Sequence, residues 1–239
     1  MARCNMADPL VCAILLTRER PEMAARAIRS FREQTYQRKR MLIYDTGQTD
    51  AYATIDPSEL GKLFRIVDEW PNARSIGKLR NAACSHEDKA EIFVHWDDDD
   101  YSHPARIAEQ VALLQSSGAA CVGYSQTLFW DTVTPPAGQA WIYSGAPIGA
   151  SFAYWRKTWK EHPFEDVSRG EDDRFWRALL VAGKKVGTCS GIADEPRMIH
   201  HVHGGNTWTP DYAKAAAHGS NNWRRAPKWD SYCKSRMSL

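Results

Sequence analysis

The sequence predicts an α/β fold with a doubly wound, mostly parallel sheet and a small added hairpin. Two observations support this prediction. Through about residue 125, apolar runs of strand length alternate with segments whose apolar residues recur at helical spacing, as in sheets whose parallel strands are connected by helices. The run at 10–17, LVCAILLT, shows no alternation of polar and apolar residues, so we expect a strand that is buried on both faces.

The helix expected after this strand shows the helical pattern clearly. Within 20–36, Pro21 suits a first turn, and apolar residues recur at helical spacing opposite arginines and glutamates. The same reasoning gives the remaining elements of this half. We expect strands within 40–50, 63–68, 90–96 and 119–125, and helices from about 77 and within 105–118.

The second half of the chain is less regular. The segments 126–132 and 139–145 flank the turn signal TPPAG, so we expect a hairpin added to one edge of the sheet. Two helices and then a strand that runs into a glycine turn are expected at 151–162, 171–183 and 196–205. In the second of these helices four residues share an apolar face: Phe175, Trp176, Leu179 and Leu180.

Composition limits the function. The 239 residues include 31 lysines and arginines against 29 aspartates and glutamates, so the basic excess of a general phosphate-backbone binder is missing and we expect no nucleic acid partner. No apolar stretch reaches the roughly 20 residues that cross a bilayer, and the N-terminus has no apolar core like that of a secretory signal. We therefore expect a cytoplasmic protein.

Six cysteines are scattered along the chain without any C-x-x-C pair. This argues against a zinc site or a disulfide scaffold, and free thiols are the simpler interpretation. The residues are Cys4, Cys12, Cys84, Cys121, Cys189 and Cys233.

Four consecutive aspartates, residues 97–100, follow the strand expected at 90–96. Each neighbouring pair repels by roughly 1 kcal/mol even in water, so we expect a cation there. Because side chains alternate along a strand, Asp97 and Asp99 can point to one side and Asp98 to the other, and two carboxylates on one side suit Mg²⁺ or Mn²⁺. The alternative is a solvated acidic turn in which Asp100 caps the following helix.

A second acidic group, Glu171, Asp172 and Asp173, opens the helix expected at 171–183. Clustered carboxylates raise one another's proton affinity, and a general base must accept a proton near neutral pH, so this group is a candidate base. The alternative is an ordinary acidic first turn, since a helix N-terminus favours anions.

Three histidines lie in the last expected strand. His201 and His203 alternate onto one face and His200 onto the other. A lone histidine is usually structural, but a pair two residues apart before Gly-Gly offers a neutral imidazole as a further metal ligand.

The first strand and helix are followed by LIYDTGQTD, IGKLRNAA, IFVHWDDDDYSHP, GEDDRFW and HVHGGNT. In this order, over about residues 10–207, the six segments resemble the family-2 glycosyltransferases of the GT-A fold. The resemblance implies an inverting enzyme that transfers a sugar from a nucleoside-diphosphate donor, usually a UDP-sugar, to an acceptor hydroxyl. It also implies help from a divalent cation, Mn²⁺ or Mg²⁺.

The resemblance implies roles for individual acidic residues and histidines. Asp172 matches the catalytic base, with Glu171 alongside it. The outer acids of the family's D-x-D motif, which contact ribose and metal, correspond to Asp97 and Asp99. His203, before Gly-Asn-Thr, could complete the metal shell. The full set of implied metal ligands is Asp99, Asp97 and His203, with His201 as the competing histidine.

The resemblance also implies a donor-binding set. Asp45 matches the aspartate that recognises the base, although this sequence has YDTGQTD where the family more often has two adjacent acids and Gly-Ser. The resemblance puts Lys78, Arg80 and Asn81 in the segment under the nucleotide, where the positive charge of a lysine or arginine side chain is favourable near a diphosphate. The donor-binding residues implied are Thr17, Arg18, Asp45, Lys78, Arg80, Asn81, Asp97 and Asp98.

We expect one domain over 1–239. Its nucleotide-binding half spans about 8–125, its acceptor and catalytic half about 126–207, and a basic tail with tryptophans about 208–239. The tail could dock on the domain as an ordinary terminus, touch anionic lipid as a peripheral membrane contact, or contact a polar acceptor.

The acceptor is expected to be a hydroxyl-bearing glycan, a lipid-linked molecule or a small molecule, with cell-surface glycan synthesis as one setting. The second half offers Trp141, Tyr143 and Trp155 as a floor on which a sugar could stack. The same three side chains could equally belong to the core.

Two other functions remain open from the sequence. One is a nucleotidyltransferase of sugar-phosphate metabolism, although LTRERPE after the first strand offers no glycine for a phosphate loop. The other is a non-catalytic module that binds metal or glycan, although the twelve-residue calcium-loop spacing is absent. Metal-dependent donor hydrolysis without acceptor would separate a glycosyltransferase from both.

Overall fold

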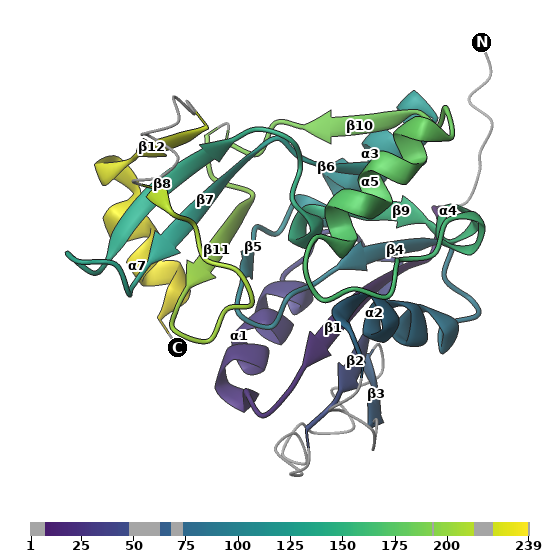
Figure 1. Cartoon of the computed structure of the whole chain (residues 1–239), viewed down its shortest axis with the longest axis horizontal. Helices are drawn as coiled ribbons and strands as arrows, with labels where there is room; N and C mark the ends of the chain where they lie inside the picture. The colour runs from purple at the N-terminus through teal and green to yellow at the C-terminus, as the bar shows by residue number, and fades with distance from the viewer. Residues whose placement is uncertain (1–7, 48–62, 68–73, 193, 213–221, 239) are drawn as a thin grey trace.

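The computed structural model describes residues 8–47, 63–67, 74–192, 194–212 and 222–238 (Figure 1). Within these residues the strands form two sheets. One has seven strands in the order β10-β6-β9-β4-β1-β2-β3, and the other has five in the order β12-β8-β7-β11-β5. The predicted α/β class, with its mostly parallel sheet, is confirmed.

The seven-stranded sheet is parallel except at β9, which lies antiparallel between β4 and β6. Its strands are β1 (Val11–Thr17), β2 (Lys39–Asp45), β3 (Leu63–Val67), β4 (Ile92–His95), β6 (Cys121–Tyr124), β9 (Ala153–Trp155) and β10 (Val186–Cys189). The last residues of the strands expected at 40–50 and 63–68 lie outside the described part.

The helix predicted over 151–162 is wrong in its first half. Residues 153–155 form β9, and only Arg156–Glu161 are helical, as α4. Phe152, Ala153 and Tyr154 are fully buried, because β9 lies in the middle of the sheet and sends consecutive side chains into the cores on both faces.

Helices cover both faces of this sheet. From β1, Val11, Ala13 and Leu15 enter a core shared with α1 and α3, whereas Cys12 and Ile14 enter a core shared with α2 and α5. The apolar run was therefore predicted correctly as a strand covered on both sides. The helices are α1 (Pro21–Arg32), α2 (Ile76–Ser85), α3 (Arg106–Ser117) and α5 (Glu171–Val181).

The apolar face predicted for α5 is narrower than expected. Phe175 and Leu179 are buried against the sheet, but Leu180 is 51% exposed. Leu180 follows Leu179 by one residue, which turns it about 100° around the helix axis and away from the sheet.

The predicted hairpin is present, but it lies in the second sheet and not at an edge of the first. β7 and β8 pair antiparallel around the TPPAG turn, and β11 pairs with β7 on the other side. The strands of this sheet are β5 (Tyr101–Ser102), β7 (Gln126–Asp131), β8 (Gln139–Ser144), β11 (Met198–Val202) and β12 (Trp223–Arg225).

The described part of the tail docks on this second sheet, as an ordinary terminus would. β12 pairs with β8, and α7 (Asp230–Met237) buries Cys233 and Met237 against Leu128 and Ile142. The guanidinium of Arg225 donates to both carboxylate oxygens of Asp230, at 2.8 and 2.6 Å, which fixes the turn between β12 and α7.

Each of the two sheets contains strands from both halves of the chain. β5, from the first half, joins the second sheet, whereas β9 and β10, from the second half, join the first. The division into a nucleotide-binding half, an acceptor half and a tail stays a prediction. In the described part of the chain, no helix combines the length and the apolar character that a bilayer span requires.

The described cysteines are free thiols, as predicted, and Cys4 lies outside the described residues. Burial is the main cause that raises the pKa of their thiols, to about 12 for Cys84. Buried thiols with raised pKa values are unreactive, which favours a packing role for them.

Candidate active site

The aspartate run lies in a turn beyond the end of β4, not in the strand itself. β4 ends at His95, so the alternation predicted for residues 97–99 is wrong. Asp98 and Asp99 instead share one cation, because Arg20 Nη1 lies 3.3 Å from Asp98 Oδ1 and 3.4 Å from Asp99 Oδ2. A turn lets neighbouring side chains point the same way, which a strand does not.

The alternative of a solvated acidic turn is also contradicted. Asp98 is 5% exposed and Asp100 is 6% exposed. Asp100 does not cap the next helix: its Oδ2 lies 2.6 Å from His200 Nδ1, and its Oδ1 accepts a hydrogen bond from the His201 N–H. Buried carboxylates require partners, and each of these has one.

Asp98 connects the run to the end of β1. The Thr17 hydroxyl donates to Asp98 Oδ2 at 2.7 Å. Burial, followed by the charge of Asp99, raises the pKa of the Asp98 carboxyl to about 7, although Thr17 and Arg20 act in the opposite direction. A cation bound nearby would favour the ionised carboxylate.

Arg80 joins the aspartate run to the acidic start of α5. This arginine of α2 is 6% exposed; its Nη2 lies 3.8 Å from Asp97 Oδ1, and its Nε donates to Glu171 Oε1 at 3.4 Å. Burial raises the pKa of the Asp97 carboxyl, although 32% of that side chain is exposed, and Arg80 lowers it. Burial likewise raises the pKa of Glu171 and Arg80 lowers it. Two acidic segments more than seventy residues apart therefore meet at one guanidinium.

Gly77 allows α2 to approach the loop before α5. Its N–H donates to the Val167 carbonyl at 3.1 Å, and a side chain at this position would overlap the Glu165 carbonyl oxygen. Only glycine permits such a close approach of two backbones, so residue 77 sets the position of Arg80 relative to α5.

Asp172 is held by backbone N–H groups. Gly149 N–H donates to Asp172 Oδ2 and Asp173 N–H donates to Asp172 Oδ1, both at 2.8 Å. Gly149 has no room for a side chain, since a Cβ there would lie 2.5 Å from Asp172 Oδ2. Its carbonyl lies 2.6 Å from Nδ1 of the fully buried His95. The candidate base therefore has a fixed orientation.

Of the two candidate histidines, His203 lies against the aspartate run. His203 Nε2 is 3.0 Å from Asp99 Oδ2, and the Asn206 side chain donates to the same oxygen at 3.4 Å. His201 Nε2 lies 3.2 Å from the Thr132 hydroxyl instead. Burial, with the charges of Arg26 and His203, lowers the pKa of His201 to about 4.

The remaining donor-binding candidates lie around these groups. Thr17 and Asp45 are neighbours in register at the carboxyl ends of β1 and β2, and Asp45 Oδ1 accepts the Gly47 N–H at 2.8 Å. Arg18 is exposed just after β1, and Lys78 pairs with Asp166 at 2.7 Å. The Asn81 side chain contacts Trp159 and both backbone polar groups of Phe164. These contacts give Asn81 a structural role, and its donor contact stays a prediction.

Sequence reasoning missed three residues of this arrangement: Arg20, Gly149 and Asn206. Arg20 follows Thr17 in TRER, where nothing in the pattern separates it from Arg18. Asn206 stands in the HGGNT segment and could have been found there as a side-chain donor beside His203. Gly149 acts through its backbone, for which the sequence carries no signal.

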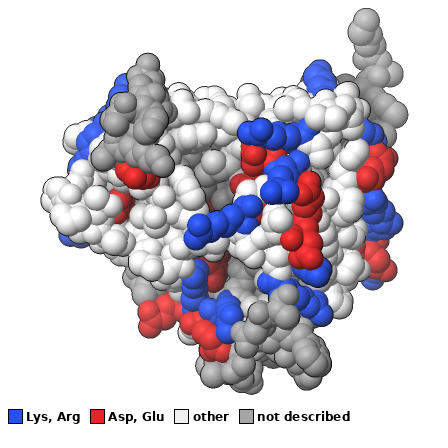
Figure 2. Space-filling model, viewed as in Figure 1, with Lys and Arg blue, Asp and Glu red and all other residues white. Residues whose placement is uncertain are grey.

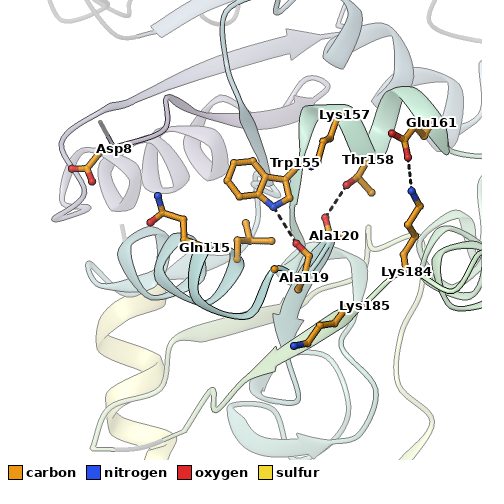
Figure 3. Close-up of a pocket in the computed structure, with 12 residues that line it drawn as sticks. Asp8, Gln115, Ala119, Ala120, Trp155, Lys157, Thr158, Glu161, Lys184 and Lys185 are labelled. Carbon is orange, nitrogen blue, oxygen red and sulfur yellow. Dashed lines mark hydrogen bonds and ion pairs between the residues drawn. The ribbon is translucent and has the colours of Figure 1, made fainter. Parts of the chain in front are cut away.

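A cavity of about 790 Å³ lies elsewhere, at the start of β6 (Figure 3). Its wall includes Trp155, Lys157, Thr158, Lys184 and Lys185, and none of the residues proposed for catalysis, donor binding or metal binding lines it. Figure 3 shows the Trp155 indole donating to the Ala119 carbonyl, at 3.0 Å. Trp155 thus belongs to the wall of this cavity and to the core. Of the two alternatives left open by the sequence, the core is the one that the structure supports for Trp155.

The fold, with its acidic groups gathered beyond the strand ends, is that of a GT-A glycosyltransferase. Residues 12–163, more than half of the chain, match the model of glycosyl transferase family 2. The chain belongs to this family, as its motifs predicted.

Solved structures of the same fold are similar to this chain over most of its length. TarS 1-349 of S. aureus in complex with UDP-GlcNAc aligns with a TM-score of 0.66 at 16% identity, covering 85% of this chain and 61% of TarS 1-349. The mannosyltransferase PcManGT from Pyrobaculum calidifontis, in complex with GDP-Man and Mn²⁺, aligns with a TM-score of 0.62 at 14% identity, covering 97% and 70%.

In another TarS structure, this chain spans only 37% of the TarS chain. A comparison with curated proteins gives no significant match. At these identities the structural likeness establishes the fold alone.

Proposed function

We propose that this chain catalyses metal-dependent, inverting transfer of a sugar from a nucleoside-diphosphate donor, a UDP-sugar, to an acceptor hydroxyl. The observation that carries the proposal is the position of Arg80 between Asp97 and Glu171. Arg80 joins the aspartate run, which suits a cation and its diphosphate, to the start of α5, where the proposed base Asp172 lies. Family membership supports a glycosyltransferase over a nucleotidyltransferase or a non-catalytic module.

The donor proposal is supported by the neighbouring structures, since TarS was solved with UDP-GlcNAc and PcManGT with GDP-Man and Mn²⁺. In this chain, Thr17 and Asp45 lie side by side at the strand ends where nucleotides bind in open α/β sheets. Arg20, which contacts Asp98 and Asp99, is a further cation that we propose for binding of the donor diphosphate.

The described residues form no cluster of three His, Cys, Asp or Glu side chains placed to hold a metal ion. They do offer a pair: Asp99 Oδ2 and His203 Nε2, 3.0 Å apart, supply one carboxylate and one imidazole. This donor set fits Mn²⁺ or Mg²⁺, which complete their coordination with water and phosphate oxygens. When bound, such a cation supplies positive charge to the departing diphosphate.

Asp172 is the proposed base. As the bond from the anomeric carbon to the diphosphate breaks and its electron pair leaves with the diphosphate, the acceptor oxygen forms the new bond from the opposite face. The proton of that hydroxyl passes to the Asp172 carboxylate, whose orientation Gly149 and Asp173 fix. Attack opposite the leaving group inverts the anomeric configuration.

The experiment offers the purified chain UDP- and GDP-sugars with Mn²⁺, Mg²⁺ or EDTA, and measures nucleoside-diphosphate release with and without added glycosides. We expect release only with metal, and at least about tenfold slower release for Asp99→Asn. Glu161→Gln, on the exposed face of α4, is the matched control and should keep the wild-type rate. Release that is unaffected by EDTA, no turnover of any donor, or pyrophosphate release from a nucleoside triphosphate and a sugar phosphate would overturn the proposal.

A further inference from the structure

One face of the second sheet carries aromatic rings from three strands. Strand pairing places Phe129 of β7 opposite Trp141 of β8, and Tyr143 of β8 opposite Trp223 of β12, so these side chains share a face. Two rings from the segment after β11 lie on top of them. We call this set the aromatic face: Phe129, Trp141, Tyr143, Trp208, Tyr212 and Trp223.

The rings of the aromatic face contact one another closely. Trp223 lies at its centre, with ring centroids 4.8 Å from Phe129, 4.9 Å from Tyr143 and 5.3 Å from Tyr212. Trp141 stacks on Tyr212 at 4.2 Å with nearly parallel planes. Such mutual packing holds the rings in fixed orientations.

This face is distinct from the core of the second sheet. The opposite face sends Leu128, Ile142 and Ile199 against α7, where they form the core between this sheet and the C-terminal helix. On the aromatic face, Phe129 is buried, Trp223 is half-buried, and Trp208 is 58% exposed. On the side seen in Figure 2, the surface over β7, β8 and β11 is largely uncharged, whereas charged side chains gather over α5 and α1.

The aromatic face is continuous with the candidate active site. Asn206, two residues before Trp208, donates to Asp99 Oδ2 at 3.4 Å. His200 contacts both regions, since its ring centroid is 4.7 Å from that of Phe129 and its Nδ1 is 2.6 Å from Asp100 Oδ2. A molecule lying on Trp208 would therefore reach toward the carboxylates.

We propose that the aromatic face is the acceptor subsite and that it binds a carbohydrate, whose ring stacks on the exposed indole of Trp208. This inference rests on the proposed function and adds the class of acceptor. A sugar ring presents C–H groups on its faces and hydroxyls at its edge, which suits flat aromatic rings beside carboxylates and imidazoles. A lipid chain would instead require a continuous aliphatic surface, whereas Leu128, Ile142 and Ile199 of this sheet are covered by α7.

The test measures binding of the full chain to an array of immobilised oligosaccharides, and to vesicles of phosphatidylglycerol and phosphatidylethanolamine. Trp208→Ala removes the ring, Trp208→Tyr keeps a ring, and Val181→Ala truncates an apolar side chain of α5 that is even more exposed, 90% against 58%. We expect the wild type to bind at least one oligosaccharide and Trp208→Ala to bind it about tenfold more weakly, with Trp208→Tyr retaining most of the affinity. Val181→Ala should match the wild type.

Binding of no oligosaccharide, equal binding by Trp208→Ala, or binding to vesicles alone would overturn the inference. UDP with Mn²⁺ is added to each variant in a thermal-shift measurement to separate this inference from the proposed function. A UDP-dependent shift without Trp208-dependent carbohydrate binding removes the acceptor subsite alone. Trp208-dependent carbohydrate binding without a UDP-dependent shift leaves the subsite in place and removes the proposed donor.

Discussion

The carboxylate site and the aromatic face lie beside each other but are stabilised by different interactions. At the site, buried charged groups depend on particular partners, such as Arg80 with Asp97 and Glu171. On the aromatic face, most of the contacts are of rings with other rings. The difference teaches that the site should tolerate almost no substitution, whereas the aromatic face should tolerate exchange of one ring for another.

The largest effect is expected where a buried charge loses its partner. Arg80→Met would leave the carboxylates of Asp97 and Glu171 without their shared cation, and we expect unfolding free energy to fall by about 3–5 kcal/mol. Urea denaturation measures this loss. Lys78→Met is the control on the same helix, because Lys78 pairs with Asp166 at the surface and its loss should barely move the midpoint. Equal midpoints for the two variants would contradict this prediction, because the buried Arg80 would then contribute no more to stability than the exposed Lys78.

A single added methyl group should disable the site without removing any charged side chain. In Gly149→Ala the new Cβ would lie 2.5 Å from Asp172 Oδ2 and displace it, so we expect kcat for transfer to fall by about 100-fold. Donor binding, measured by calorimetry with UDP, should change little, because the hydrogen bonds of Gly149 are with Asp172, His95 and Phe152 and not with the aspartate run. Unchanged kcat would mean that the orientation of Asp172 is unimportant.

His95 makes the site region sensitive to pH. Burial, and then the charge of Arg80, lowers the pKa of His95 well below its usual range, so the folded protein keeps this imidazole neutral while the unfolded chain protonates it. The unfolded state thus binds the extra proton below about pH 6.5, and stability should fall by about 1.4 kcal/mol for each further unit of acidification. Between pH 6.5 and 5.5 the part of this decrease due to His95 is about 1 kcal/mol, because the unfolded imidazole is already half protonated at pH 6.5. Other groups with shifted pKa values, such as Asp98 and His201, also contribute to the wild-type pH dependence. Urea denaturation at both pH values therefore compares the wild type with His95→Gln, and the wild type should lose about 1 kcal/mol more than the variant. An equal pH slope in the variant would contradict the assignment.

A substitution on the aromatic face should reduce the unfolding free energy least. Phe129→Leu keeps an apolar side chain at a buried position, and we expect it to lower unfolding free energy by about 1 kcal/mol. The same urea measurement serves here. A loss as large as that of Arg80→Met would remove the contrast between the two regions.

The fold was predictable where one physical constraint dominated. β1 is buried on both faces, so every position had to be apolar and the run was unambiguous. β9 was predicted as helix because only three residues of FAYWRKTW form the strand, and its neighbours come from distant segments. A strand that short carries no periodicity of its own.

The site was predictable in composition but not in geometry. The aspartates, the acidic helix start and HVHGGNT were all recognisable, and Arg80, which the resemblance assigned to donor binding, contacts Asp97 of the aspartate run. The choice of Arg20 over Arg18, and the contact of His203 with Asp99, depend on how turns fold after β1 and β11, which local sequence does not determine.

The central claim is that the aspartate run and Asp172 serve one reaction, the first holding the donor and the second accepting the proton. Asp172→Asn tests it when UDP-sugar affinity and the transfer rate are measured on the same preparation. We predict a dissociation constant within about threefold of wild type and a transfer rate lower by about 10² to 10⁴. A wild-type transfer rate in this variant would contradict the account.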